Sequence, residues 1–370
     1  MEERKVGKII IFFAFIIIIC CSRVIWFFSE RYLDTTNYEN RQLAMRPVLS
    51  FNSYKTFSRD YTAYFNDNIQ FRNYLIKMNS AIDYYCFGQS SNDEVVIGKD
   101  NWLFYSRIDD GDPIGCYKGT NLFTEEELKS IAENCVKQRD FVVSQGKEFV
   151  IFIAPNKERI YSEFMPARYG KPAENYRALQ LYDYLLNNTD LRVIYPYDEL
   201  MRAKENLNET IYSKTDTHWN YLGGYVGATA LLKALDVNMP DISSENIKIN
   251  VSGKPYGDLA RMLNLRSVLT KDDHEYTVSG FDMHDVRCID DDLDNSRCYK
   301  SVNADSRCVY VIGDSFIEHM EGYIGSQFNN TYVRHYASYT YDDYVDCNPD
   351  IMVYECVERR VDVLGSFSIQ

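Results

Sequence analysis

"CVYVIGDSF", residues 308–316, is the stretch that decides the fold of this chain. The residues from Val309 to Ile312 are apolar without alternation, which is typical of a strand buried on both faces of a parallel sheet. Gly313 permits a sharp turn, and the following "IEHMEGYIGSQF" is predicted to be a helix. We therefore expect Ser315 at the carboxyl end of a strand and at a helix N-terminus, where open α/β sheets place their chemistry.

Strands and helices alternate on both sides of this stretch. "KEFVIFIAPNKERIY" (147–161) contains an unbroken apolar strand, preceded by a helix with Thr124 and Glu127 as a capping box and a stop at Gly146. Further helices are expected over residues 51–85, 174–189, 198–206 and 220–235, and further strands over residues 94–105, 191–197, 331–337 and 348–360. Residues 236–306 break the pattern with turn-forming and charged residues and are interpreted as an insertion. The sequence predicts one doubly wound, three-layer α/β domain with a parallel sheet.

The N-terminus carries the clearest compositional feature. "KIIIFFAFIIIICCSRVIWFF", residues 8–28, is long and apolar enough to span a bilayer, with basic residues before it and aromatic residues after it. We expect residues 1–29 to be a cytoplasmic stub and a single transmembrane helix, residues 30–50 a tether, and residues 51–370 an extracytoplasmic domain at the cell membrane. The alternative is a cleaved signal peptide, although no small-x-small cleavage motif follows the apolar run.

Composition and charge limit the possible functions. The chain has 370 residues, 45% of them hydrophobic, and a net charge of -14, which disfavours nucleic acid as a partner. Cys288 and Cys298 flank an acidic loop and are the expected disulfide pair. They belong to an even set beyond the span that allows four disulfides: Cys86, Cys116, Cys135, Cys288, Cys298, Cys308, Cys347 and Cys356. No Cys or His cluster has metal-ligand spacing, so no metal is expected.

"TDTHWN", residues 215–220, supplies a candidate general base. In an extended segment, Asp216 and His218 would project to the same side, so that Asp216 orients Nδ1 and leaves Nε2 facing outward. A serine hydroxyl needs such a base, so we expect Ser315 to be the nucleophile, His218 the base and Asp216 its orienting carboxylate. Because His218 precedes a helix, the helix dipole is expected to disfavour its protonated form.

Each motif also has a purely structural interpretation. The Asp or Ser of "GDS" caps a helix, and "DTHW" starts a helix with a packed tryptophan. His319 is the rival base, but a side chain four residues from Ser315 on a helix points along the helix instead of across the site. The backbone N–H of Ser315, at the positive end of the helix, is expected to stabilise an oxyanion.

Seven short motifs in order resemble one known family. They are "ENRQLAMRP", "GKDNWLFY", "APNKERIY", "TDTHWN", "GDLARML", "GDSF" and "VYECVERR", and they extend from about residue 38 to residue 360. They resemble the alginate-acetylation (AlgX/AlgJ) type of SGNH-hydrolase-like proteins, including the bacterial DHHW group. The resemblance implies an SGNH-like fold with Ser315, His218 and Asp216 as its triad.

The same resemblance implies a function. It implies a membrane-anchored, extracytoplasmic O-acetyltransferase acting on cell-surface polysaccharide, without a metal, with the acetyl group delivered by a membrane-bound O-acyltransferase partner. The alternatives are an acetylesterase of the same fold, a non-catalytic polysaccharide-binding or assembly protein, and an adhesin. No nucleotide or coenzyme A motif is present, so no cofactor is expected.

The chain departs from the wider SGNH superfamily in two ways. The Asp and His precede the serine, as in the alginate-acetylation branch, so the triad order is permuted. The asparagine that completes the oxyanion hole elsewhere has no match, because the corresponding strand end reads "YECVERR". Tyr354 or Arg359 is a substitute donor, although Arg359 is also expected to pair with Glu358. Gly313 and Trp219 complete the set of candidate site residues.

Overall fold

The computed structural model describes residues 10–17, 25, 27, 28, 31, 42–51, 53–69, 71–292 and 296–370. The chain divides into two compact units, one of residues 1–91 with 263–265 and the other of residues 92–262 with 266–370. The first unit contains α2 (Tyr54–Asp67), α3 (Arg72–Ile82) and a short π-helix (Asp83–Phe87), so the helices expected within residues 51–85 are confirmed.

No helix in the described part of the chain is long and apolar enough to cross a bilayer. Most of the run 8–28, where a span is expected, lies outside the described residues, and residues 10–17 within it are helical. Of the tether expected over 30–50, residues 42–50 form neither helix nor strand.

The second unit is built on a seven-stranded sheet of order β4-β3-β11-β9-β10-β8-β7. Its strands are β3 (Glu148–Ala154), β4 (Val193–Ile194), β7 (Arg287–Asp292), β8 (Ser296–Lys300), β9 (Asp305–Gly313), β10 (Phe328–His335) and β11 (Ile351–Val357). The strands from β4 to β10 pair in parallel, but β8 is antiparallel to both of its neighbours, β10 and β7. The expectation of an all-parallel sheet is therefore wrong. The antiparallel pair comes from the insertion, because so short a connection between β7 and β8 permits only antiparallel pairing.

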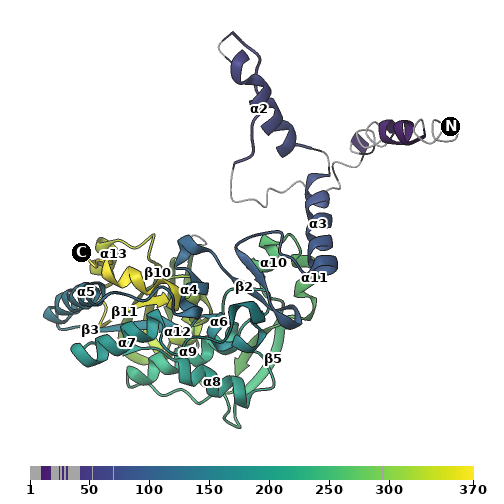
Figure 1. Ribbon diagram of the computed structural model, residues 1–370. Helices are drawn as coiled ribbons and strands as arrows, with labels where there is room; N and C mark the ends of the chain where they lie inside the picture. The colour runs from purple at the N-terminus through teal and green to yellow at the C-terminus, as the bar shows by residue number, and fades with distance from the viewer. Residues whose placement is uncertain are drawn as a thin grey trace. The chain divides into compact units, whose positions relative to one another are not determined.

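Helices cover both faces of this sheet (Figure 1). On β9, Val309 and Val311 face one hydrophobic core, whereas Tyr310 and Ile312 face the other. The first core is closed by α8 (Tyr197–Asn206), α9 (Tyr221–Ala234) and α12 (Glu321–Gln327), and the second by α5 (Glu125–Ser144), α7 (Arg177–Asn188) and α13 (Tyr341–Cys347). This is the three-layer α/β arrangement that the sequence predicts.

Local sequence signals place several of these elements correctly. Thr124 and Glu127 form the capping box at the start of α5, with Glu127 N donating to Thr124 Oγ1 at 3.2 Å. Asp100 and Asn101 adopt positive φ in the turn between β1 (Val95–Ile97) and β2 (Leu103–Tyr105).

Short α-helices and strands complete the unit, besides several 3-10 turns. They are α4 (Pro113–Lys118), α6 (Lys157–Ile160), α10 (Asp258–Met262), α11 (Arg266–Leu269), β5 (Lys248–Gly253) and β6 (Glu275–Ser279).

A buried lysine lies beyond the carboxyl end of β3. Lys157, on α6, is only 1% exposed, and its Nζ donates to Ser213 O at 3.1 Å, to Lys214 O at 3.4 Å and to Asp216 O. A charged donor inside the protein requires such acceptors to offset its lost hydration. The loop 213–216 is thereby fixed to the end of β3.

The two residues that follow Lys157 are also buried and charged. Glu158 Oε1 accepts from Tyr105 N at 3.0 Å, which ties β2 to α6. Arg159 Nε lies 3.4 Å from Glu358 Oε1, which ties the end of β11 to the same turn. The sequence motif "NKER" thus joins three separate segments at one edge of the sheet.

The eight cysteines beyond residue 28 do not form four disulfides. Six of them are thiols in the structure: Cys86, Cys116, Cys135, Cys308, Cys347 and Cys356. In the β7–β8 ladder, Cys288 is opposite Tyr299 and Cys298 is opposite Asp290. This register does not support the expected pair of Cys288 with Cys298.

Two adjacent glycines bring α9 close to its neighbours: Gly224 faces the segment that carries Ser315, and Gly223 faces the loop of Ile211. A Cβ at Gly224 would lie 2.1 Å from the carbonyl oxygen of His319, and one at Gly223 would lie 2.3 Å from that of Ile211. Both distances are far inside van der Waals contact. A side chain at either position would push α9 away from its neighbours.

We predict that Gly224→Ala destabilises the fold by about 1–3 kcal/mol, the usual cost of overpacking. Urea unfolding of the full chain measures this change. Gly322→Ala, on α12, is the matched control because a Cβ there meets nothing within 4 Å. It should be neutral or stabilise the fold by up to about 1 kcal/mol through helix propensity. Equal stabilities of the two variants would contradict the close approach.

Candidate active site

Ser315 lies where the sequence places it, directly after β9. It begins a 3-10 helix, η8 (Ser315–His319), instead of the expected α-helix, and α12 follows two residues later. Asp314 caps this turn, since its Oδ1 accepts from Phe316 N at 2.8 Å and its Oδ2 from Val357 N at 2.8 Å. Asp314 therefore fixes the serine turn to the end of β11.

Asp216 accepts hydrogen bonds with both carboxylate oxygens. Its Oδ1 accepts from His218 Nδ1 at 2.6 Å and from His218 N at 3.2 Å. Its Oδ2 accepts from Gly257 N at 2.7 Å and from Asp258 N at 3.0 Å. Residues 216–218 form a bend and not the extended segment that was expected. The bend allows the ring Nδ1 and the backbone N of His218 to donate to the same oxygen, Oδ1 of Asp216.

The other nitrogen of the same ring reaches the serine. His218 Nε2 lies 2.7 Å from Ser315 Oγ, a hydrogen-bond distance between a candidate base and nucleophile. The His218 side chain is 19% exposed, which leaves access from solvent. His319, the rival base, has its Nε2 3.8 Å from Glu275 Oε1 instead. The structure thus brings together the three residues expected to form the triad.

Trp219 joins the two loops that carry these residues. Its Nε1 donates to Phe316 O at 2.9 Å, and its side chain is fully buried. Because Trp219 follows His218 and Phe316 follows Ser315, this hydrogen bond fixes the spacing between imidazole and hydroxyl. A buried indole offers no surface to a substrate, so its place in the site is structural.

Two of the other candidates have different surroundings. Gly313 ends β9, and a Cβ there would lie 2.6 Å from Glu355 Oε2, so a side chain would displace that carboxyl. Tyr354 faces the core on the opposite side of the sheet, where its ring centroid is 4.0 Å from that of Phe367. Strand alternation explains this orientation and keeps Tyr354 away from Ser315.

Arg359 does lie beside the site. Its guanidinium carbon is 5.7 Å from the ring centroid of Phe316, and its Nε donates to Asp110 Oδ2 at 3.2 Å. The expected pair of Glu358 with Arg359 is wrong, since Glu358 pairs with Arg159. The side chains of consecutive residues at the end of β11 diverge, so Glu358 turns inward and Arg359 turns toward the serine loop.

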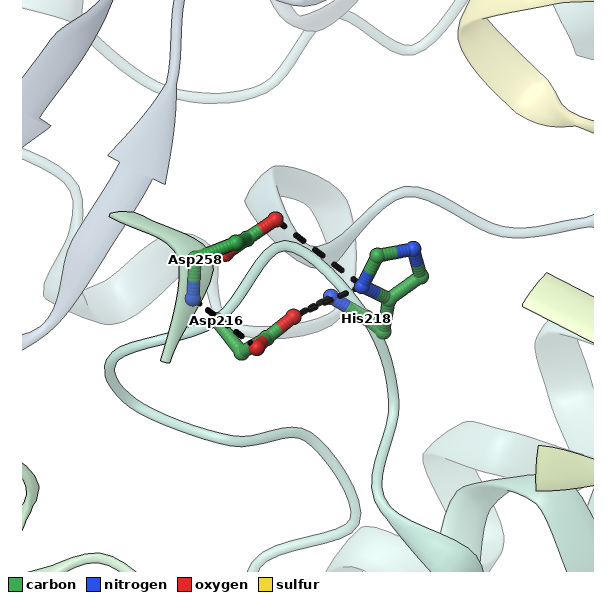
Figure 2. Close-up of side chains that lie close together, drawn as sticks. All are labelled: Asp216, His218 and Asp258. Carbon is green, nitrogen blue, oxygen red and sulfur yellow. Dashed lines mark hydrogen bonds and ion pairs between the residues drawn. The ribbon is translucent and has the colours of Figure 1, made fainter. Parts of the chain in front are cut away.

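Asp258 is a site residue that sequence reasoning missed. Its Oδ2 lies 3.9 Å from His218 Nδ1. Thr217 donates two hydrogen bonds to this carboxylate: its backbone N donates to Oδ1 at 2.8 Å, and its Oγ1 donates to Oδ2. Thr217 Oγ1 is itself 3.2 Å from His218 Nδ1. Figure 2 shows both carboxylates on one side of the imidazole, with the second ring nitrogen turned away. The signal was the motif "GDLARML", to which the sequence alone gives no role.

The two carboxylates change the charge state of the ring. Burial lowers the pKa of His218, but the hydrogen bond and charge of Asp216 outweigh it, and Asp258 adds to them, so the pKa rises to about 9. Burial and the charge of Asp216 raise the pKa of Asp258 to about 6. The helix dipole was expected to disfavour the protonated form of His218, but the nearby carboxylates favour that form, and the net pKa is raised.

Asp216, His218 and Asp258 also offer ligand atoms within 4.8 Å of one another. Their oxygens already accept from protein donors: Asp216 from the amides of Gly257 and Asp258, and Asp258 from Thr217. A cation would have to displace these bonds. The donor set fits a hydrogen-bonded acid–base pair better than a metal centre.

Comparisons with known proteins identify the family of this chain. Residues 95–318 match the family model described as "SGNH hydrolase-like domain, acetyltransferase AlgX". The chain is 29% identical over 196 residues to a probable alginate O-acetylase AlgJ of Pseudomonas putida, covering 50% of this chain and 46% of the relative. A probable alginate O-acetylase AlgJ of Pseudomonas syringae is 24% identical over 217 residues, covering 55% and 49%. The chain thus spans about half the length of the curated relatives it matches.

Solved structures share the fold. Bacillus cereus PatB1 with a sulfonyl adduct is 15% identical with a TM-score of 0.50, covering 74% of this chain and 99% of that one. A DHHW family protein from Eubacterium siraeum is 16% identical with a TM-score of 0.50, covering 73% and 97%. Since the family model covers more than half of the chain and contains Asp216, His218 and Ser315, this chain belongs to the AlgX-type family of SGNH hydrolase-like acetyltransferase domains.

Proposed function

We propose that this chain is a serine-dependent O-acetyltransferase that works through a triad of Ser315, His218 and Asp216. One observation carries the proposal: His218 Nε2 lies 2.7 Å from Ser315 Oγ while Nδ1 lies 2.6 Å from Asp216 Oδ1. A hydroxyl, a base and an orienting carboxylate in this order are what acyl transfer through serine requires. Membership in an acetyltransferase family supports acetyl as the group transferred.

The reaction has two steps. In the first, Ser315 Oγ attacks the acetyl carbonyl carbon of a donor ester, and neutral His218 takes the hydroxyl proton and passes it to the departing donor oxygen. In the second, an acceptor hydroxyl attacks the acetyl-serine, His218 takes its proton, and that proton returns to Ser315 Oγ as the acyl bond breaks. Asp216 stabilises the imidazolium that forms in each step.

The oxyanion of each step needs hydrogen-bond donors. The neighbouring amides are occupied, since Asp314 N donates to Glu355 Oε2 and Phe316 N to Asp314 Oδ1. The Ser315 amide between them has no such partner among the described residues, so it is the first donor. Arg359, held beside Phe316 by Asp110, is proposed as the second donor or as a substrate contact.

The acceptor is proposed to be a hydroxyl of a cell-surface polysaccharide. The names of the AlgJ relatives as alginate O-acetylases support this class of substrate. We also propose that residues 8–28 anchor the chain in the cell membrane with the catalytic unit outside, because their length and composition suit a span. A membrane-bound O-acyltransferase is the proposed source of the acetyl group.

We predict that Ser315→Ala lowers acetate release from 4-nitrophenyl acetate by at least about a thousandfold, because removing the nucleophile disables the whole triad. A sulfonyl fluoride should label wild type on the peptide that contains Ser315, and mass spectrometry detects the adduct. Ser338→Ala, an exposed serine, is the control and should keep full activity. Undiminished activity of Ser315→Ala would refute the role of the nucleophile.

We further predict an alkaline pH profile. His218 accepts a proton only when neutral, and its raised pKa of about 9 keeps it protonated below that value. The ratio kcat/KM should therefore rise with pH through a midpoint near 9 and level off only above it. Asp258→Asn removes a negative charge that favours the imidazolium, so the midpoint should move to lower pH, whereas Arg359→Gln, which removes a positive charge, should move it higher.

Rates of 4-nitrophenyl acetate hydrolysis from pH 5 to 10 measure both midpoints. Asp282→Asn is the matched control, because Asp282 pairs with another histidine, His284, at 3.4 Å. It should leave the midpoint unchanged. A midpoint for Asp258→Asn at or above that of wild type would contradict the influence of Asp258 on the ring.

A further inference from the structure

A second histidine stands beside the triad without a role in the mechanism above. The ring of His319, at the end of η8, is 6.2 Å from the ring of His218 at an interplanar angle of 26°. On its other side lies Tyr221, with ring centroids 4.8 Å apart. Tyr221 begins α9, so the loop of His218, the end of η8 and the start of α9 meet at His319.

Neither nitrogen of His319 makes a hydrogen bond to the protein within the described residues. Its Nδ1 is buried and has no hydrogen-bond partner. Its Nε2 is 3.8 Å from Glu275 Oε1, which is close enough for an ion pair but too long for a hydrogen bond. Nε2 lacks a hydrogen bond but, unlike Nδ1, is not buried, so it is the nitrogen that a ligand can reach.

Tyr221 adds an exposed aromatic surface to this histidine. It is 41% exposed, although Trp219, two residues earlier, is fully buried. Glu275, from β6 of the insertion, has a side chain that is only 13% exposed, and its Oε2 accepts from Tyr221 N at 3.4 Å. An aromatic face with a carboxylate and an uncommitted imidazole at its edge suits a ring that presents C–H groups on one side and hydroxyls around it.

We propose that Tyr221, His319 and Glu275 form the subsite that binds the acceptor sugar next to Ser315. The sugar ring packs on Tyr221, and His319 and Glu275 hydrogen-bond to its hydroxyls. This inference rests on the proposed transferase function and deepens it. The bound sugar presents one further hydroxyl to the acetyl-serine and excludes water from that position, which favours transfer over hydrolysis.

The attacking group remains the acceptor hydroxyl, and the proton remains with the triad. The acceptor oxygen forms a bond to the acetyl carbon, the bond from that carbon to Ser315 Oγ breaks, and His218 moves the proton from the acceptor to Oγ. Tyr221, His319 and Glu275 bind and take no proton. Their loss should therefore affect the transfer of the acetyl group more than its capture by Ser315.

The test measures two products from one reaction. The full-length chain receives 4-nitrophenyl acetate with either a mannuronate hexamer or cellohexaose, one acidic and one neutral acceptor. Mass spectrometry counts acetylated oligosaccharide, and the release of nitrophenol in the first turnover reports acylation. Tyr221→Ala and His319→Ala should each lower the ratio of transfer to hydrolysis about tenfold, the effect of one lost contact, and should lower acylation by a smaller factor than transfer.

Matched controls exclude a structural effect. Tyr341→Ala removes a tyrosine of similar exposure, 38%, that also begins a helix after a capping residue. His284→Ala removes a histidine that is also paired with a carboxylate. Both controls should keep the wild-type ratio. His319→Gln, which retains a donor and an acceptor, should recover part of the transfer lost in His319→Ala.

The outcomes separate this proposal from the one it rests on. A wild type that hydrolyses the ester but acetylates neither oligosaccharide would overturn the transferase function and the subsite together. A wild type that transfers, with an unchanged ratio in Tyr221→Ala and His319→Ala, would overturn the subsite alone. A parallel loss of acylation and transfer would assign these residues to structure and would overturn the subsite as well.

Discussion

The ammonium of Lys157 determines where the loop of Asp216 can lie. It is buried at the end of β3 and donates to the carbonyls of Ser213, Lys214 and Asp216. Burial lowers the pKa of this group, and nearby carboxylates, Glu158 first among them, act against that shift. Hydrogen bonds from a charged donor contribute about 1.5–3 kcal/mol each, enough to offset part of the cost of desolvation. Because Lys157 holds the backbone carbonyl of Asp216, it also fixes the position of the Asp216 carboxylate.

The same loop is held from the other side by the insertion. Gly257 N and Asp258 N donate to Asp216 Oδ2, and Asp273 Oδ2 accepts from both N and Oγ1 of Thr215. The segment 236–306 therefore supplies the charged environment of the base, and its β7 and β8 extend the sheet. The sequence of this segment does not reveal the contribution. Its contacts are hydrogen bonds between amides, a hydroxyl and carboxylates, and these leave no periodic pattern of apolar residues.

Local patterns were sufficient to predict much of the fold. The apolar run of β9, the capping box of α5 and the start of α9 near Asn220 depend on neighbours within a few residues, and each was placed correctly. The grouping of Ser315 with His218 also followed, since the rule that strand ends carry the chemistry acts at long range. Buried charge escaped prediction. Lys157 and Asp258 have partners about 40 to 60 residues away, and charged residues are by default assigned to the surface.

The hydrogen bond from Trp219 to Phe316 and the cap from Asp314 to Val357 join parts of the chain that are distant in sequence. With Lys157 they make the position of the Ser315 hydroxyl dependent on contacts between distant parts of the second unit. Such contacts form late, because each must first overcome the entropy of closing a long loop. A nascent polypeptide would thus contain Ser315 and His218 without the 2.7 Å contact between them, because only the folded unit brings the two side chains together.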